Sequence, residues 1–475
     1  MLCLQCMTIF PVKPGQFQMW VIFLNKAKLK MNKVSFINKQ TAIFLLLLQL
    51  VMLTGLQKSR AQVLTAGEAV NIAVENNFNI RISRLGEEEM KNNLTYGNAG
   101  FLPSIDLSAA QNNSITNSRQ EYLSGQINER DNAKSNSFSS NLGLDWTVFD
   151  GLRMFNNYKL LGNQLRAGEL RTRMQVENAI SSVLINYYNI VQLHQKVVVF
   201  EKAVSLGEEL TGIAREMLLI GSGSRLDLLQ AEVDLNTDKS QLLDLQQRIA
   251  EASIALNQLL ARDAGIEFAV EDTFRLMPGF DYSNLLQKTE AENSGLLLNN
   301  LDIEMAMNNL DIIKGSRLPV VGVNAGYNFN VQASESGFVK SGRTSGLNYG
   351  ITASMSLFNG FNLKRQQQNA RIGIEMAQLH LDAYQSEIRA MLLSTYTAYT
   401  SRLKMVSFEK LNLETSNINF EIAGERFRLG ELSGLEYREA QKNLLLANER
   451  LINAQFEVRL LEINLLQLSG SILPE

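Results

Sequence analysis

The chain contains an internal duplication, and this feature constrains its fold more than any other. The segment TVFDG at 147–151 recurs as SLFNG at 356–360, and Gly221 recurs as Gly430, both at an offset of 209 residues. Upstream the offset is 216, and the extra seven residues fall between two predicted strands, where loops tolerate changes of length. We therefore predict two homologous repeats, 62–262 and 281–475, joined by a linker at 263–280.

Each repeat contains two segments in which apolar and polar residues alternate. The clearest is VVGVNAGYNFNV at 320–331, where apolar residues take the odd positions and Gly or Asn take most even ones. A period of two predicts a strand with one apolar and one polar face. Strands of about ten residues are long enough to cross a bilayer at a tilt. The pattern predicts four such strands, at 104–113, 138–149, 320–331 and 347–358.

After each second strand the periodicity becomes helical. The segments 153–219 and 362–428 contain no proline, which permits two continuous helices of about 100 Å each at 1.5 Å per residue. Each ends in a glycine-bearing turn, and a second helix follows at 225–260 and at 435–469. The second helices carry an apolar heptad seam, which predicts coiled-coil packing; Asp238 is the one break in this seam.

The first 61 residues have the pattern of an export signal preceded by an upstream extension. They carry eight of the 45 Lys and Arg residues and no Asp or Glu, and an apolar core at 42–56 precedes Ser59-Arg60-Ala61, where small residues stand at the positions that signal peptidase reads. The core is shorter than the ~20 residues of a spanning helix. We expect translation to start at Met31 and the mature chain to begin at Gln62, without either cysteine.

Charge and residue usage argue against several classes of function. Without 1–61 the chain has 37 Lys and Arg against 48 Asp and Glu, a net charge of −11, whereas nucleic-acid phosphates require clustered basic residues. His194 and His380 each stand in a helical segment without a second ligand at a suitable spacing, so we expect no metal and no cofactor. The serine of GELSG (430–434) is misplaced for a nucleophile elbow, and we expect no enzymatic activity.

Four strands cannot close into a barrel, and open strand edges are unfavourable in lipid, where each unpaired amide or carbonyl costs several kcal/mol. Several copies must therefore share one barrel, and three copies give twelve strands. At this point a resemblance is apparent: over 64–470 the chain resembles the TolC family of outer-membrane efflux proteins. The motifs that carry it, in order, are GFLPS (100–104), WTVFDG (146–151), GSGSRLDLLQAE (221–232), MSLFNG (355–360) and GELSGLEYREAQ (430–441).

The resemblance implies a mixed, mainly α-helical fold and a homotrimer. Its strands would form a shared twelve-stranded barrel in the outer-membrane lipid, and its long antiparallel helices a periplasmic α-helical tunnel. The implied function is the exit channel of a tripartite efflux or type I secretion system. Substrates would pass from an inner-membrane pump of the RND or ABC type, through a periplasmic adaptor (membrane fusion protein) at the tunnel tip, to the exterior.

Three acidic residues are implied to line the periplasmic constriction. Glu436 and Glu439 lie three residues apart on one helical face, where relatives carry acidic residues, and three copies would place six carboxylates around one axis. Asp227 takes the corresponding place in the first repeat. Phe427 and Leu432 replace the tyrosine and arginine that bond the gate in some relatives, so a latch of that kind is not expected. A solvated helix face, or a first-turn acid favoured by the helix dipole, is the alternative explanation.

The two tip turns are the candidate contacts for the adaptor. They comprise Gly221, Ser222, Gly223 and Ser224 in the first repeat, and Gly430, Glu431, Leu432, Ser433 and Gly434 in the second. The alternative from another class is a soluble periplasmic coiled-coil scaffold or a pump adaptor. Such a protein would share the export signal and the heptads, but would lack four bilayer-length strands and a duplication of the whole chain.

Overall fold

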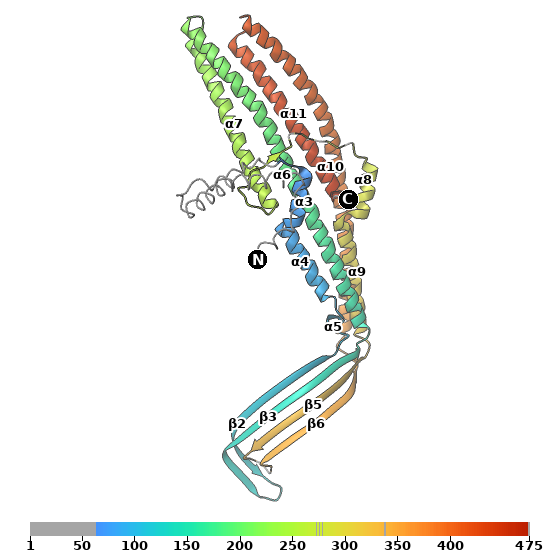
Figure 1. The fold of residues 1–475 in the computed structure, drawn as a ribbon. Coiled ribbons are helices and arrows are strands. Elements are labelled where there is room, and N and C mark those ends of the chain that lie inside the picture. Colours follow the sequence, from blue (N-terminus) through green and yellow to red (C-terminus); the bar gives the residue numbers. More distant parts are fainter. Residues whose placement is uncertain (1–62, 272, 275, 278, 337–338, 474–475) are drawn as a thin grey trace, which may run out of the picture. The chain divides into compact units, whose positions relative to one another are not determined.

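The structure, a computed structural model, describes residues 63–271, 273–274, 276–277, 279–336 and 339–473 (Figure 1). The expected export signal at 1–61 and the expected start at Met31 lie outside these residues. Within the described part, no helix combines the length and the apolar character that crossing a membrane requires.

The two long strands of each repeat together form one antiparallel sheet, in the order β2-β3-β5-β6. Each repeat contributes one hairpin, and the two hairpins meet where β3 pairs with β5. The strand bounds are β2 Ser104–Glu121, β3 Ile127–Phe149, β5 Val320–Ser334 and β6 Ser341–Ser354.

The register of this sheet separates an apolar face from a polar one. One row of directly paired residues crosses all four strands as Leu107, Leu142, Tyr327 and Leu347. The adjacent row, on the opposite face, is Ser108, Asn141, Asn328 and Gly346. Because neighbouring rows alternate between the two faces, the period of two in the sequence becomes a two-sided sheet.

All four expected strands differ in length from those of the structure, and the strand expected at 320–331 continues to Ser334. The strands expected at 104–113 and 138–149 belong to a longer hairpin, since β2 continues to Glu121 and β3 begins at Ile127. Most of the added residues are polar, and the apolar ones, such as Ile115 and Ile127, stand singly, so these stretches show no regular alternation. The strand expected at 347–358 begins at Ser341 and ends at Ser354, because β5 offers no ladder partner beyond Val320, which follows Pro319.

The two strand-to-helix junctions have the same backbone conformation, and the repeated motif TVFDG (147–151) and SLFNG (356–360) lies at these junctions. Gly151 and the next residue, Leu152, both have positive φ, of 78° and 69°, and Gly360 and Phe361 repeat this pair at 66° and 63°. The residue before each glycine caps the new helix: Asp150 Oδ1 accepts from Met154 N at 3.1 Å. Asn359 Oδ1 accepts from Leu363 N in the second copy. The Asp or Asn followed by Gly therefore turns the chain from strand to helix.

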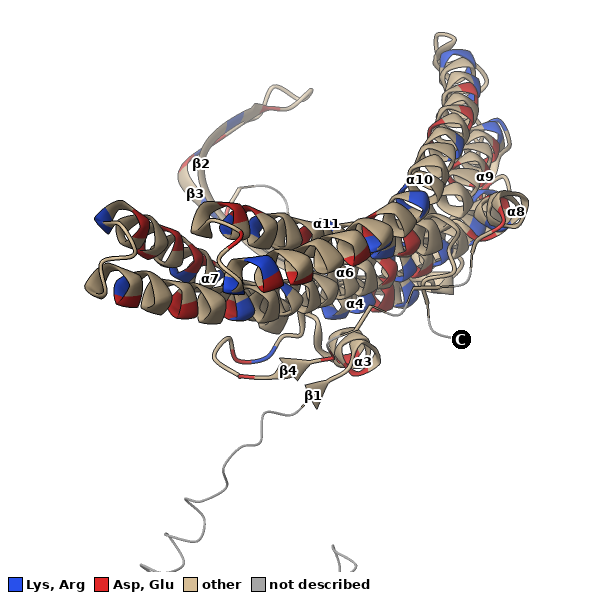
Figure 2. Cartoon of the chain, turned by 90° about the horizontal axis from the view of Figure 1, so that it is seen from above, with Lys and Arg blue, Asp and Glu red and all other residues tan. Residues whose placement is uncertain are grey.

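Two long helical hairpins extend from these junctions. The first consists of α6 (Arg153–Leu219) and α7 (Arg225–Leu259), and the second of α10 (Asn362–Arg428) and α11 (Gly434–Leu468). At 1.5 Å per residue, the 67 residues of α6 place its tip turn about 100 Å along the helix from the sheet junction. Acidic and basic side chains are interspersed along the helices (Figure 2).

Shorter helices pack beside the long ones. They are α3 (Ala66–Asn76), α4 (Phe78–Asn93), α5 (Tyr96–Ala99), α8 (Tyr282–Glu292) and α9 (Ser294–Gly315). Helix α4 packs on α6, and α9 packs on both α6 and α10. The helical half nearest the sheet therefore has the order α4, α6, α9, α10, whereas the half nearest the tips has the order α7, α6, α11, α10.

The main core lies where the two halves meet. It contains Tyr187 of α6, Leu256 of α7 and Ile463 of α11, all fully buried. The segment between the repeats joins this core: its strand β4 (Ala269–Val270) pairs in parallel with β1 (Val63–Leu64). The hydroxyl of Tyr187 donates to Leu64 O at 2.9 Å and accepts from Glu271 N at 3.1 Å, so one core side chain fixes both segments.

Candidate functional site at the helical tips

The two tip turns are built by the same backbone device. Helix α6 stops just before Gly221, which has φ of 80°, and α10 stops just before Gly430, with φ of 75°. The following amides return to the helix: Ser222 N donates to Met217 O, and Glu431 N donates to Arg426 O, both at 2.9 Å. This is the glycine-terminated helix end that satisfies the last carbonyls, and it requires a residue that tolerates positive φ.

The descending helices begin with capping boxes. Ser224 Oγ accepts from Asp227 N at 3.1 Å, and the Asp227 carboxylate accepts in return from Ser224 N at 3.1 Å and from Ser224 Oγ at 2.6 Å. Ser433 and Glu436 repeat the arrangement at the start of α11. Two of the three expected pore acids therefore also cap their own helices, which is the role that first-turn acids have in many proteins.

These caps lower the pKa of both carboxyl groups. The hydroxyl of Ser224, followed by its backbone amide, holds the pKa of Asp227 below its ordinary value. For Glu436 the backbone amide of Ser433 has the larger effect on the pKa, and the hydroxyl the smaller. Both side chains are exposed, and so is Glu439, one turn further along α11.

A cavity of about 370 Å³ lies between the two tips. It brings Asp227 together with residues of both turns, among them Gly223 and Ser433. Glu436 and Glu439 are not among the residues that line it. The structure thus joins one expected pore acid to both expected adaptor-contact turns, and leaves the other two acids on the exposed face of α11.

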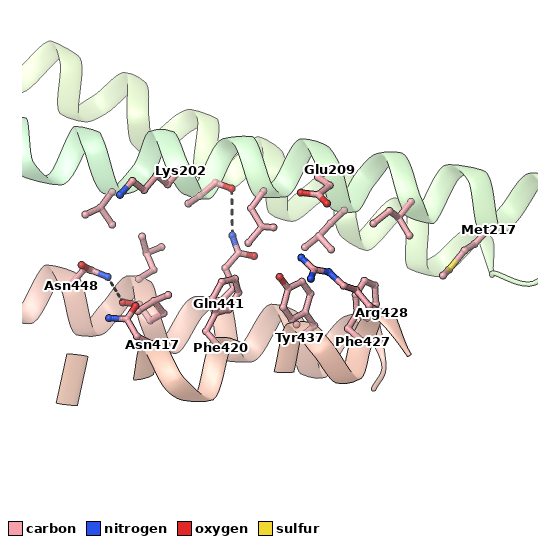
Figure 3. A pocket seen from close by; sticks show the side chains of 18 residues that line it. Lys202, Glu209, Met217, Asn417, Phe420, Phe427, Arg428, Tyr437, Gln441 and Asn448 are labelled. Carbon is pink, nitrogen blue, oxygen red and sulfur yellow. Dashed lines mark hydrogen bonds between the residues drawn. The ribbon is translucent and has the colours of Figure 1, made fainter. Parts of the chain in front are cut away.

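A larger groove of about 790 Å³ lies between α6 and the second hairpin (Figure 3). Leu206, Leu210 and Ile213 of α6 form one wall, and Phe420 and Phe427 of α10 belong to the other. Lys202, Glu209 and Gln441 add polar groups, and Gln441 Nε2 donates to Ala203 O at 3.4 Å. Leu210, Ile213, Met217 and Phe427 also line the cavity between the tips, so an apolar surface runs from the groove to the tip turns.

Tyr437 organises the second wall of the groove. Its ring stacks on Phe420 with centroids 5.3 Å apart and on Phe427 with centroids 5.0 Å apart, both at 11°. A Cβ on Gly424 would lie 3.5 Å from the same ring. Burial, and then Glu209, raise the pKa of the Tyr437 hydroxyl. The ring therefore joins α10 and α11 just below the tip.

An ion pair between the hairpins was not expected from the sequence. Arg438 of α11 donates to both carboxylate oxygens of Asp238 on α7, at 2.7 Å and 2.9 Å, and its Nε lies 3.7 Å from Asp234 Oδ2. The Asp238 side chain is only 5% exposed. Burial opposes the charge of Arg438, but Asp238 and Asp234 outweigh it and raise the pKa of the guanidinium. The break at Asp238 in the heptad seam was the signal that could have revealed this pair.

Within the residues that the structure describes, no three His, Cys, Asp or Glu side chains are grouped so as to hold a metal ion.

Comparison with known proteins identifies the family. The family model described as outer membrane efflux protein matches residues 69–262 and 285–471. The outer membrane efflux protein BepC of Brucella suis is 21% identical over 436 residues, which cover 91% of this chain and 90% of BepC. The cation efflux system protein CusC of Escherichia coli O157:H7 is 22% identical over 424 residues, with coverage of 83% and 84%.

Solved channel structures share the fold. The CmeC outer membrane channel of Campylobacter jejuni superimposes with a TM-score of 0.73 at 17% identity, covering 86% of this chain and 85% of CmeC. The open state of the MtrE outer membrane channel of Neisseria gonorrhoeae gives a TM-score of 0.66 at 17% identity, with coverage of 86% and 89%.

Proposed function

Because the chain belongs to the outer membrane efflux protein family, we propose that three copies of it form one exit channel of a tripartite efflux or secretion system. The protein is an outer-membrane channel and not an enzyme. The family assignment gives no support to the alternative of a soluble scaffold or adaptor.

The observation that carries the trimer is the sheet register. One apolar row crosses all four strands, yet the outer edges of β2 and β6 pair with no further strand among the described residues of one copy. Unpaired backbone groups are not stable in lipid. Pairing of β6 from one copy with β2 of the next satisfies both edges, and three copies close a twelve-stranded barrel with the apolar face outward.

The apolar band of the sheet is nearly as tall as the apolar part of a membrane. On β3, the outward positions from Trp146 to Phe138 span eight residues, or about 26 Å along the strand at 3.3 Å per residue. At a strand tilt of about 40° this gives a height of roughly 20 Å, a little less than the ~25 Å band of outer-membrane barrels. Aromatic side chains mark both limits. Trp146 Nε1 donates to Phe101 O at the end near the helices, and Phe138 contacts Phe329 edge-on at the other.

The helices support the same closure. In both halves of the helical region, α10 stands at one end of the packing order, and α4 or α7 stands at the other. These three helices carry rows of exposed apolar side chains at helical spacing, which would pair between copies: Phe78, Ile82 and Leu85 on α4; Leu226, Leu229 and Val233 on α7; Ile372, Met376, Leu379, Met405, Phe408, Leu411, Ile418 and Ile422 on α10.

The tips are the place where a periplasmic adaptor would bind, and the adaptor would connect the channel to an inner-membrane pump of the RND or ABC type. The tip turns Gly221–Ser224 and Gly430–Gly434 flank the cavity between the tips, and the apolar groove continues from it. A helical hairpin with an apolar stripe and a polar tip suits such a surface.

Glu436, Glu439 and Asp227 would line the periplasmic constriction. Capping by Ser224 and Ser433 keeps Asp227 and Glu436 charged to lower pH, so the ring would favour cations over anions. We further propose that 1–61 is an upstream extension with an export signal, and that 62–262 and 281–475 are the two repeats around the segment 263–280.

Disulfide trapping tests the trimer. Each test variant carries two substitutions in one chain: Leu107→Cys on β2, and one of Leu347→Cys, Tyr349→Cys or Ile351→Cys on β6. In the proposed trimer, oxidation of outer membranes should link the β6 cysteine of one copy to the β2 cysteine of the next, and should yield linked dimers and trimers. The matched control is Leu142→Cys with Tyr327→Cys, which face each other within one copy and should leave a monomer band. A mature chain that stays monomeric and water-soluble without detergent, or β2 to β6 linkage within one chain, would refute the shared barrel.

A further inference from the structure

The hairpin formed by β2 and β3 extends well beyond the rest of the sheet. Pairing of β3 with β5 ends at Ser135 with Ser334, whereas pairing of β2 with β3 continues to Glu121 with Ile127. Eight further residues of β3 are thus in a two-stranded ladder, which adds about 26 Å. We call the residues Ser118–Arg130 the distal ribbon.

The distal ribbon lies outside the apolar band. Past Phe138, the outward-facing positions of β3 become polar, with Asn136 and Lys134, and Gln111 of β2 is hydrogen-bonded to Asn136. Ile115, which pairs with Lys134, is an isolated apolar residue on this face. The guanidinium of Arg343 lies 4.9 Å from the ring of Phe329 at this level, as expected where lipid gives way to water. The ribbon itself carries charged side chains on both strands, so it belongs in water.

A built-in bulge separates the ribbon from the sheet. The β2–β3 register shifts between Thr116 and Ser118, and Asn132 on the opposite strand has φ of 53°. Asn117 Oδ1 accepts from Asn132 N at 2.7 Å, so a side chain replaces the missing ladder bond. A bulge of this kind bends a hairpin, and the ribbon turns away from the direction of the four strands (Figure 1).

The ribbon is long enough to reach the axis of the proposed barrel. Twelve strands about 4.8 Å apart and tilted by about 40° enclose a radius of roughly 12 Å. The six residues from Ser118 to Leu123 span about 20 Å when extended. The tip is held by hydrogen bonds from Tyr122 N to Gln126 O and from Gly125 N to Tyr122 O, at 2.9 Å and 2.8 Å, so it is a formed turn.

Two apolar side chains of the ribbon, Leu123 and Ile127, remain exposed in the part of the chain that the structure describes. Leu123 is fully exposed, and Ile127 is 48% exposed. An isolated two-stranded ribbon is marginal in water unless it packs on something. Arg119 and Glu129, which face each other across the ribbon, make lipid an unsuitable surface. The corresponding tips of two other copies would supply apolar contacts in water.

We propose that the distal ribbon folds inward across the extracellular mouth, so that three ribbons meet near the axis and narrow the exit of the channel. This inference rests on the proposed trimeric barrel. The polar barrel wall would then be wider than its outlet, and the ribbons would hinder large solutes that enter from outside while yielding to outward flow.

Thiol labelling from outside intact cells tests the inference, because it does not depend on the state of the periplasmic tip. Ser139→Cys places the thiol on the polar face of the barrel wall, level with Asn330. We compare it in the full chain and in a chain where 118–131 is replaced by Asn-Gly between Asn117 and Asn132. Both natural cysteines, Cys3 and Cys6, lie in the proposed cleaved segment, so the background is clean.

A small maleimide should label Ser139→Cys at the same rate in both chains, whereas a maleimide on a bulky polyethylene glycol should label the shortened chain about ten-fold faster. Lys340→Cys, on the rim of the shorter hairpin, is the matched control and should show no difference. Equal rates for the bulky reagent at Ser139→Cys would overturn the proposal.

A cross-link gives an independent reading: Leu123→Cys should form linked dimers on oxidation, and Lys340→Cys should not. Leu123→Cys that stays monomeric on a denaturing gel would show that the tips do not meet, and would likewise overturn the proposal. Detergent-stable trimers and efflux activity, measured on the same variants, separate this failure from a failure of the proposed channel.

Discussion

Arg438 holds Asp238 with two hydrogen bonds, of 2.7 Å and 2.9 Å, and the two residues belong to different helical hairpins. The pair therefore ties the first repeat to the second about four helical turns below the tip turn of α7. Asp238 occupies a seam position where every other heptad supplies an apolar side chain. Among the described residues, Arg438 provides the counter-charge for its nearly buried carboxylate.

Removing the arginine should be costly. Arg438→Ala leaves the nearly buried Asp238 carboxylate without its counter-charge, and we expect a loss of about 3–5 kcal/mol in the local stability of α7 and α11. Replacing both residues together, as Asp238→Leu with Arg438→Met, should restore most of it, since an apolar pair of similar size needs no desolvation. Amide hydrogen exchange of the two helices measures both changes; an Arg438→Ala protein as protected as the parent would contradict the pair's role.

The two junction glycines should respond differently to the same substitution. A Cβ on Gly151 would lie 2.1 Å from Gly315 O, whereas the nearest atom to a Cβ on Gly360 is 4.0 Å away. Both have positive φ, so Gly360→Ala should cost about 1 kcal/mol from backbone strain alone. Gly151→Ala adds a clash with backbone and should cost roughly 3 kcal/mol or more.

The yield of detergent-stable trimer and its unfolding temperature compare the two glycine variants, each serving as the other's control. Equal losses in both would mean that contact with Gly315 does not limit the first junction.

Acid should loosen the tips. The folded-state pKa values of Asp227 and Glu436 are lowered from 3.8 and 4.5 by their serine caps, so each carboxylate stabilises its helix start fully above those ordinary values. The contribution disappears as the pH falls through the lower folded-state pKa. We expect the protection factors of the amides at 224–228 and 433–437, which are corrected for the intrinsic exchange rate at each pH, to fall below about pH 4, and Ser224→Ala to cost about 1 kcal/mol at neutral pH.

The matched control is Asp227→Asn, which should remove the acid dependence at the first tip and leave the second tip unchanged. Both proteins are measured from about pH 3 to about pH 6, a range that includes the ordinary carboxyl pKa values. If the parent and this variant have the same protection factors throughout that range, the assignment of Asp227 as a cap is wrong.

Substitutions of the two exposed acids of α11, Glu436 and Glu439, should distinguish an effect on ion selectivity from an effect on helix capping. Glu439→Gln should weaken the preference for cations in planar bilayers without changing the exchange of the tip amides, because Glu439 lies beyond the capping box. Glu436→Gln should change both, since its carboxylate also caps α11. Unchanged ion selectivity in the double variant would remove both residues from the constriction.

Much of the fold follows from local sequence. The long helices α6 and α10 have the bounds that periodicity and proline placement predict, because helix ends are set by nearby residues such as Asp150 before one helix and Gly221 after it. The capping acid Asp227 was also foreseeable, as the alternative explanation for that position. These features depend on contacts within a few residues, which is what a single sequence encodes most directly.

The distal ribbon and the partner of Asp238 were not foreseeable in the same way. Outside the apolar residues near its tip, the segment 118–130 is polar and shows no hydrophobic alternation, so only pairing across the hairpin identifies its two strands. The ion pair joins residues 200 positions apart. The sequence by itself determined the duplicated strand-to-helix plan and the two faces of each strand. Only the tertiary structure decided that β3 lies beside β5 and that Arg438 reaches Asp238, because such pairings depend on which distant surfaces meet and not on local periodicity.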